Sequence, residues 1–227
     1  MAALNYFYFL LLLFSRSHLL TTRILRLINV NFFFLHYRRA ILSNPDVLST
    51  TPWAKLIYND FWGTLLSDTG SHGSYRPLCV LSYKLNHMVD GLNPWGYHLV
   101  NVLLHCLATS LVVKLARQLI PTLWGAAVAG ALFASHPIHT EAVAGVVGRA
   151  DLAACNFYLL TFLTYAKHVT WREQCDWRNW PALLGAVILS AAAVLCKETA
   201  ITALLVCGIY DGIKALSGYR DKVRFLG

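Results

Sequence analysis

Long apolar stretches separated by short polar breaks make up most of the chain from residue 97 onward. They cover residues 97–119, 123–135, 152–169, 182–196 and 200–213. A transmembrane helix needs about 20 mainly apolar residues, because a helix rises about 1.5 Å per residue and the hydrocarbon core is about 30 Å thick. The first stretch meets this length and the others approach it. The pattern predicts an all-α integral membrane protein, with a polytopic helical bundle over residues 96–227.

The first 37 residues follow a less regular pattern. Two short apolar runs, 4–14 and 28–37, flank a segment that carries three arginines. Neither run alone is long enough to span, so we predict one span within residues 1–37 and about five to six in the whole chain. The first run has the length of a signal-peptide core but lacks a basic segment before it and a small-residue cleavage site after it.

Basic residues predict which side of the membrane each loop faces. If every apolar stretch crosses once, residues 114–121, 167–180 and 214–224 share one side. In and beside these segments lie nine Lys and Arg against four Asp and Glu. Cytosolic loops are enriched in Lys and Arg, so this side is cytosolic. Residues 38–95, 136–151 and 197–199 then face the lumen or exterior.

Residues 38–95 form the one long polar segment. It holds four of the chain's seven prolines and several Trp and Tyr residues. Amphipathic aromatic rings settle at membrane–water interfaces, and a loop this long in a compact protein usually has a function. We predict a long luminal loop with interfacial helices.

Composition agrees with a membrane protein. The chain is 57% apolar and only 13% Asp, Glu, Lys and Arg, which is about half the charged share of an ordinary soluble domain. The net charge of +8 comes from groups that flank apolar runs. These groups form no basic stripe with exposed aromatics, so we predict no nucleic-acid partner. The six cysteines contain no C-x-x-C pair, which argues against a zinc ribbon or a disulfide framework.

Several charged and polar residues on the predicted luminal side are candidates for chemistry. Arg76, beside Pro77, has a planar fork suited to phosphate, although it could equally cap a surface helix. Lys197 and Glu198 interrupt an apolar run. They fit either a helix boundary or a site that binds an anion. The other candidates on this side are His136, His139, Glu141, Arg149 and Asp151.

Two alternatives remain open for this group. His136 and His139 are three residues apart and could share a metal, but no third ligand is specified, and histidines hydrogen-bonded within the bundle fit as well. Arg149 could pair with Asp151 or Glu141 in a purely structural role, because unpaired charges at membrane depth cost a few kcal/mol each.

Six motifs in order resemble the transmembrane and tetratricopeptide-repeat (TMTC) family, from about residue 38 to the end. They are NDFWG at 59–63, SYRPL at 74–78, GYHLVN at 96–101, SHPIHTEAV at 135–143, GRADL at 148–152 and CKET at 196–199. The resemblance implies a GT-C glycosyltransferase fold in the endoplasmic reticulum membrane. It also implies transfer of mannose from dolichyl phosphate mannose to Ser or Thr of secretory-pathway proteins, with cadherin-type domains as acceptors.

The implied mechanism is inverting. An acidic base takes the proton of the acceptor hydroxyl, and cations stabilise the departing lipid phosphate. By position and charge, the candidates for the phosphate are Arg76, Arg149 and Lys197. The scheme requires no metal and no cofactor beyond the lipid-linked donor.

Two departures from the family pattern stand out. The family places an acidic pair just before Arg39-Ala40-Ile41, but His36 and Tyr37 occupy these positions. The match also fades before residue 38, so we hypothesise an alternative or mis-joined first exon for residues 1–37, which sequencing the transcript's 5′ end tests. The later spans and the tetratricopeptide repeats are absent, which suggests a fragment or short isoform.

Three functions remain in competition at this point. The first is a protein O-mannosyltransferase or part of one, and the second is a catalytically silent subunit of the same fold. A small transporter fits less well, because transporter sites use polar groups on broken helices at mid-membrane.

Overall fold

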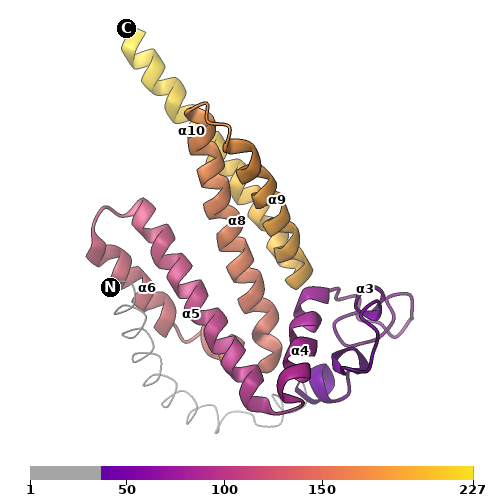
Figure 1. Cartoon of the computed structure of the whole chain (residues 1–227). Helices are drawn as coiled ribbons and strands as arrows, with labels where there is room; N and C mark the ends of the chain where they lie inside the picture. Colours follow the sequence, from indigo (N-terminus) through magenta and orange to yellow (C-terminus); the bar gives the residue numbers. More distant parts are fainter. Residues whose placement is uncertain (1–36, 227) are drawn as a thin grey trace.

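The computed structural model describes residues 37–226, with side chains as far as residue 217 (Figure 1). The span predicted within residues 1–37 lies outside the described residues, except for Tyr37. His36 also lies outside them. Within residues 37–226 the secondary structure is helical, apart from an isolated β-bridge between Asn59 and Leu65. The prediction of an all-α protein is confirmed.

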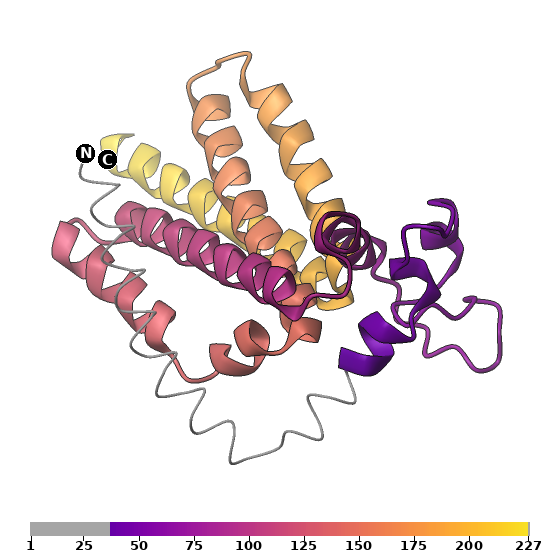
Figure 2. The ribbon, with the colours of Figure 1, turned by 60° about the horizontal axis from the view of Figure 1, so that its bottom comes forward.

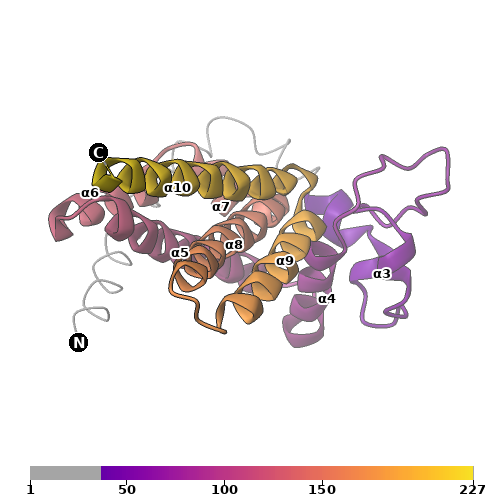
Figure 3. The same ribbon diagram turned by 90° about the horizontal axis from the view of Figure 1, so that it is seen from above.

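Four helices of the described region are long and apolar enough to cross a membrane. They are α5 (Pro94–Leu119), α8 (Arg149–Glu173), α9 (Asn179–Cys196) and α10 (Thr202–Leu226). Helices α5, α8 and α9 each contain one of the predicted apolar stretches, and α10 contains the stretch 200–213 except its first two residues. Helix α8 is central, since it packs against α5, α9 and α10 (Figure 3). The chain is a multi-pass membrane protein.

The fifth predicted stretch forms a shorter helix. Helix α6 (Leu123–Ser135) has 13 residues, so it is about 20 Å long and does not cross a 30 Å hydrocarbon core alone. The chain completes its return along α5 through α7 (His139–Ala144) and the 3-10 turn η3 (Val146–Gly148). Figure 2 shows α7 lying between α6 and the start of α8.

The helix ends are distributed between the two ends of the bundle as the charge pattern predicted. The C-terminal ends of α5, α8 and α10 lie at one end of the bundle, and α4 lies at the other (Figure 1). At the basic end, Arg172 of α8 pairs with Asp211 of α10. The outward faces of α9 and α10 are apolar and exposed, as a lipid-facing surface requires; they include Leu184, Val187, Ile188, Leu205 and Ile209.

The 38–95 segment folds into short helical pieces over one end of the bundle. These are η1 (Arg38–Leu42), η2 (Pro45–Val47), α3 (Lys55–Tyr58) and α4 (Pro77–Asp90). They share a buried apolar core that includes Ile41, Phe61, Tyr83 and Tyr97. Because Tyr97 belongs to α5 and Tyr83 to α4, this core fixes the segment to the bundle.

Polar turns hold this segment in shape. Asn44 caps η2 through its side chain, which accepts a hydrogen bond from the backbone N–H of Asp46. The Asp60 carboxylate accepts hydrogen bonds from the backbone of residues 62, 64 and 72 and from the Ser71 hydroxyl. Burial alone would raise the pKa of Asp60, but these bonds outweigh it and leave the pKa below its usual value.

Lys84 ties α4 to the start of the segment. Its side chain is completely buried, and its ammonium donates to the carbonyls of Leu48 and Thr51 at 2.5 and 2.8 Å. Burial lowers the pKa of Lys84, and Asp46 partly offsets this. A buried cation is tolerated here because carbonyl oxygens replace its water.

Candidate functional site

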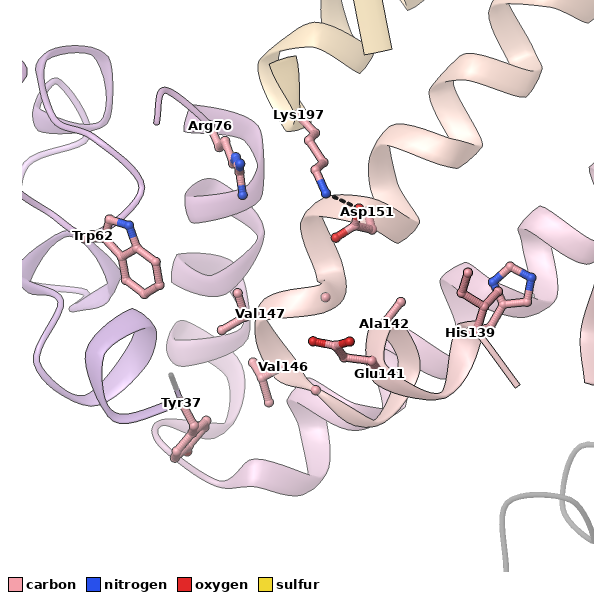
Figure 4. Close-up of a pocket in the computed structure, with 13 residues that line it drawn as sticks. Tyr37, Trp62, Arg76, His139, Glu141, Ala142, Val146, Val147, Asp151 and Lys197 are labelled. Carbon is pink, nitrogen blue, oxygen red and sulfur yellow. Dashed lines mark hydrogen bonds and ion pairs between the residues drawn. The ribbon is translucent and has the colours of Figure 1, made fainter. Parts of the chain in front are cut away.

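A cavity of about 700 Å³ lies where α4, α7 and the starts of α8 and η4 (Glu198–Ile201) meet (Figure 4). Its walls combine charged, aromatic and apolar side chains. The lining consists of Tyr37, Trp62, Arg76, Ile138, His139, Glu141, Ala142, Gly145, Val146, Val147, Gly148, Asp151 and Lys197. The cavity thus gathers candidates from five separate stretches of sequence.

Two ion pairs mark one end of the cavity. Lys197 pairs with Asp151, and Arg76 pairs with Glu198 at 3.1 Å between Nη2 and Oε2. All four side chains are partly solvent-exposed; those of Lys197 and Arg76 are 27% and 21% exposed. Exposed ion pairs contribute about 1 kcal/mol or less, so a phosphate can exchange with the carboxylates at little cost.

The turn after α9 creates this arrangement. Lys197 is extended (φ −158°, ψ 132°) between α9 and η4, so its side chain and that of Glu198 reach different partners. Lys197 contacts the first turn of α8, and Glu198 contacts the residue before α4. The break in the apolar run is therefore both a helix boundary and the source of a cavity cation.

Arg149 is not brought to the cavity. Its side chain is completely buried, with Nε 3.0 Å from Asn101 Oδ1, Nη1 2.6 Å from Asn86 Oδ1 and Nη2 2.8 Å from the Tyr97 carbonyl. The rings of Tyr83 and Tyr97 lie 4.7 and 5.5 Å from its guanidinium carbon. With its donors engaged and two tyrosine rings beside it, Arg149 fastens α8 to α4 and α5 and does not line the cavity.

The cavity continues from its charged end along an apolar wall. Ile138, Ala142, Val146 and Val147 belong to this wall. At the deep end, His139 contacts His105 of α5, with ring centroids 5.1 Å apart. Because His105 is 11 residues along α5 from Pro94, it lies about 16 Å from that end of the helix. The cavity therefore reaches from the loop-bearing end to the side of the bundle beside α5, where Ile138 is 72% exposed.

The predicted histidine pair belongs to an aromatic stack. His139 lies 4.4 Å from Phe133 and 6.0 Å from His136, measured between ring centroids. Burial, with His136 nearby, lowers the pKa of His139 and favours its neutral form. Among residues 37–226, no group of three or more His, Cys, Asp and Glu has the arrangement to hold a metal ion.

Of the two positions where an acid is expected, the structure describes one. Tyr37 lines the cavity, and its hydroxyl donates to the Leu92 carbonyl at 3.1 Å. Burial raises the pKa of Tyr37, so its hydroxyl stays protonated at neutral pH. The sequence did not identify Trp62 or the apolar wall as parts of a site, because nothing in their spacing links them before the chain folds.

Sequence comparison identifies the relatives of this chain. It is 63% identical over 188 residues to protein O-mannosyl-transferase Tmtc2 of Drosophila melanogaster, 82% of the chain. It is 52% identical over 173 residues to human TMTC2 and 44% identical over 172 residues to mouse TMTC3, in each case 76% of the chain. This chain belongs to the TMTC family.

The TMTC chain spans about a fifth of the length of these relatives, covering 20%, 21% and 18% of them respectively. No protein-family profile and no solved structure matches it. The GT-C fold therefore stays a prediction, while the helical membrane bundle is observed.

Proposed function

We propose that this TMTC chain carries the donor site and the mannose-transfer activity of a dolichyl-phosphate-mannose-dependent protein O-mannosyltransferase in the endoplasmic reticulum membrane. Its acceptors are Ser and Thr of secretory-pathway proteins, cadherin-type domains among them. One observation carries the proposal: a single cavity joins a cationic end to an apolar wall. The names of the TMTC relatives, which are protein O-mannosyl-transferases, support it.

The cavity suits a lipid-linked phosphate. Arg76 and Lys197 meet the phosphate, and Arg76 does so with a planar fork that can donate two hydrogen bonds. The polyprenyl chain lies against the apolar wall. When the sugar leaves, negative charge grows on the phosphate oxygens, and two cations already positioned there stabilise that charge in the transition state.

Loss of the cavity cations weakens donor use. We expect Arg76→Ala and Lys197→Ala each to raise the donor KM about 10-fold or more, because a charge-assisted hydrogen bond to phosphate contributes about 1.5–3 kcal/mol. Mannose transfer from dolichyl phosphate mannose to a cadherin domain, by membranes carrying the chain, measures this. Arg178→Ala, at the opposite end of the bundle, is the control and leaves the KM unchanged. Equal KM values for all four proteins would contradict the assignment.

A catalytically silent subunit is the second candidate, and Tyr37 is the observation that favours it. An uncharged phenol stands in the cavity where the family pattern expects an acid. The double variant His36→Asp, Tyr37→Asp separates the two functions. Transfer by the unmodified chain rejects the silent subunit, whereas transfer only by the double variant supports it. No transfer by either protein would reject the transferase.

A further inference from the structure

Two carboxylates line the cavity, and they differ in whether a cation pairs with them. Asp151 is engaged by Lys197 at the cationic end. Glu141 has no ion pair and no side-chain hydrogen bond to any residue between 37 and 217. Its carboxylate points into the cavity in Figure 4. Among the residues whose side chains the structure describes, Glu141 is therefore a solvent-exposed acid at the cavity without a counter-ion.

The position of Glu141 is set by rigid contacts. It belongs to α7, whose C-terminal end is held where Asn101 Nδ2 donates to the Gly145 carbonyl at 3.0 Å. The backbone of Ala142 packs directly on Gly148, at the start of α8. These contacts are made by neighbours of Glu141, so its side chain stays available while its backbone is fixed.

Glu141 also stands apart from the phosphate end. In Figure 4, Arg76 and Lys197 lie toward α4 and the end of α9, and Glu141 lies beyond Asp151, on α7. Inverting transfer needs a base on the face of the sugar opposite its phosphate. Of the two cavity carboxylates, Asp151 contacts the cation Lys197, and Glu141 is the one that no described cation pairs with.

We propose that Glu141 is the general base of mannose transfer in this chain, in place of the acids expected at positions 36 and 37. The proposal rests on the proposed function. The acceptor hydroxyl oxygen forms a bond to C1 of mannose as the bond from C1 to the phosphate oxygen breaks. The bonding pair leaves with dolichyl phosphate, beside Arg76 and Lys197. The hydroxyl proton passes to the Glu141 carboxylate and then to water.

Glu141→Gln tests the proposal, because an amide keeps the shape of the side chain and cannot accept the proton. A positioned general base contributes about 10²- to 10⁴-fold, so kcat is expected to fall at least about 100-fold. The donor KM is expected to stay within about 2-fold, which also shows that the variant is folded. Glu173→Gln, at the far end of α8, is the matched control and keeps full activity.

The outcomes separate this inference from the proposed function. If the unmodified chain transfers mannose and Glu141→Gln transfers it equally well, Glu141 is not the base and the transferase function stands. If only the His36→Asp, Tyr37→Asp variant is active, Glu141 is again excluded, because it was present in the silent chain. If neither the unmodified chain nor the His36→Asp, Tyr37→Asp variant transfers mannose, both the role of Glu141 as the base and the proposed transferase function are wrong.

Discussion

Replacing Arg149 with methionine is expected to lower the free energy of unfolding by about 3 kcal/mol or more. The change leaves the Asn86 and Asn101 side-chain oxygens and the Tyr97 carbonyl without their donor. A buried polar group left without its partner costs about 1–3 kcal/mol, and Asn101 is completely buried while Asn86 is partly buried. The change also removes a cation that packs against two aromatic rings. Methionine fills part of the volume, so the loss reflects mainly the missing hydrogen bonds.

Denaturant unfolding of the detergent-solubilised chain measures the effect. Arg178→Ala is the control, since Arg178 is exposed, pairs with nearby Asp176 and lies over the ring of Trp171. That variant should unfold as the unmodified chain does, because exposed ion pairs contribute little. A stable Arg149→Met protein would mean that α4 is not fastened to the bundle through this side chain.

The bundle was predictable from sequence because membrane spans depend on a simple quantity. A stretch such as 97–119 is apolar for nearly its full length, and only a helix satisfies its backbone groups in lipid. The observed helix limits differ from the predicted ones where a capping residue determines the start of the helix. Helix α5 begins at Pro94, three residues before the apolar stretch, because Asn93 caps it and proline suits a first turn.

The candidate site was only partly predictable. Arg76, Lys197, Glu141 and Asp151 stood out as charges in a chain that has few, and the structure brings all four to one cavity. Arg149 stood out for the same reason, yet it is buried among Asn86, Asn101 and Tyr97. Charge alone does not distinguish a binding arginine from a structural one, because that depends on which elements meet around it. Asn101, a polar residue within an apolar span, was the one available signal.

Gly148→Ala is expected to disable the site without touching a charged group. A Cβ atom at this position would lie 2.4 Å from both Cα and the carbonyl oxygen of Ala142. Backbone atoms cannot rotate away, so α7 must shift relative to α8. Overpacking of this kind costs about 1–3 kcal/mol. Glu141 adjoins Ala142 and moves with it, and a misplacement of about 1 Å can cost about 100-fold in rate.

Mannose transfer and unfolding of Gly148→Ala, measured together, check this prediction. Gly212→Ala in α10 is the matched control, because an added Cβ there meets no heavy atom within 4 Å. In a helix interior, alanine is about 1 kcal/mol more favourable than glycine, so the control should be as stable as the unmodified chain or more so. Full activity and stability of Gly148→Ala would show that α7 and α8 are not in direct backbone contact. A loss confined to kcat, with the donor KM preserved, would place the damage at Glu141 rather than at Arg76 and Lys197.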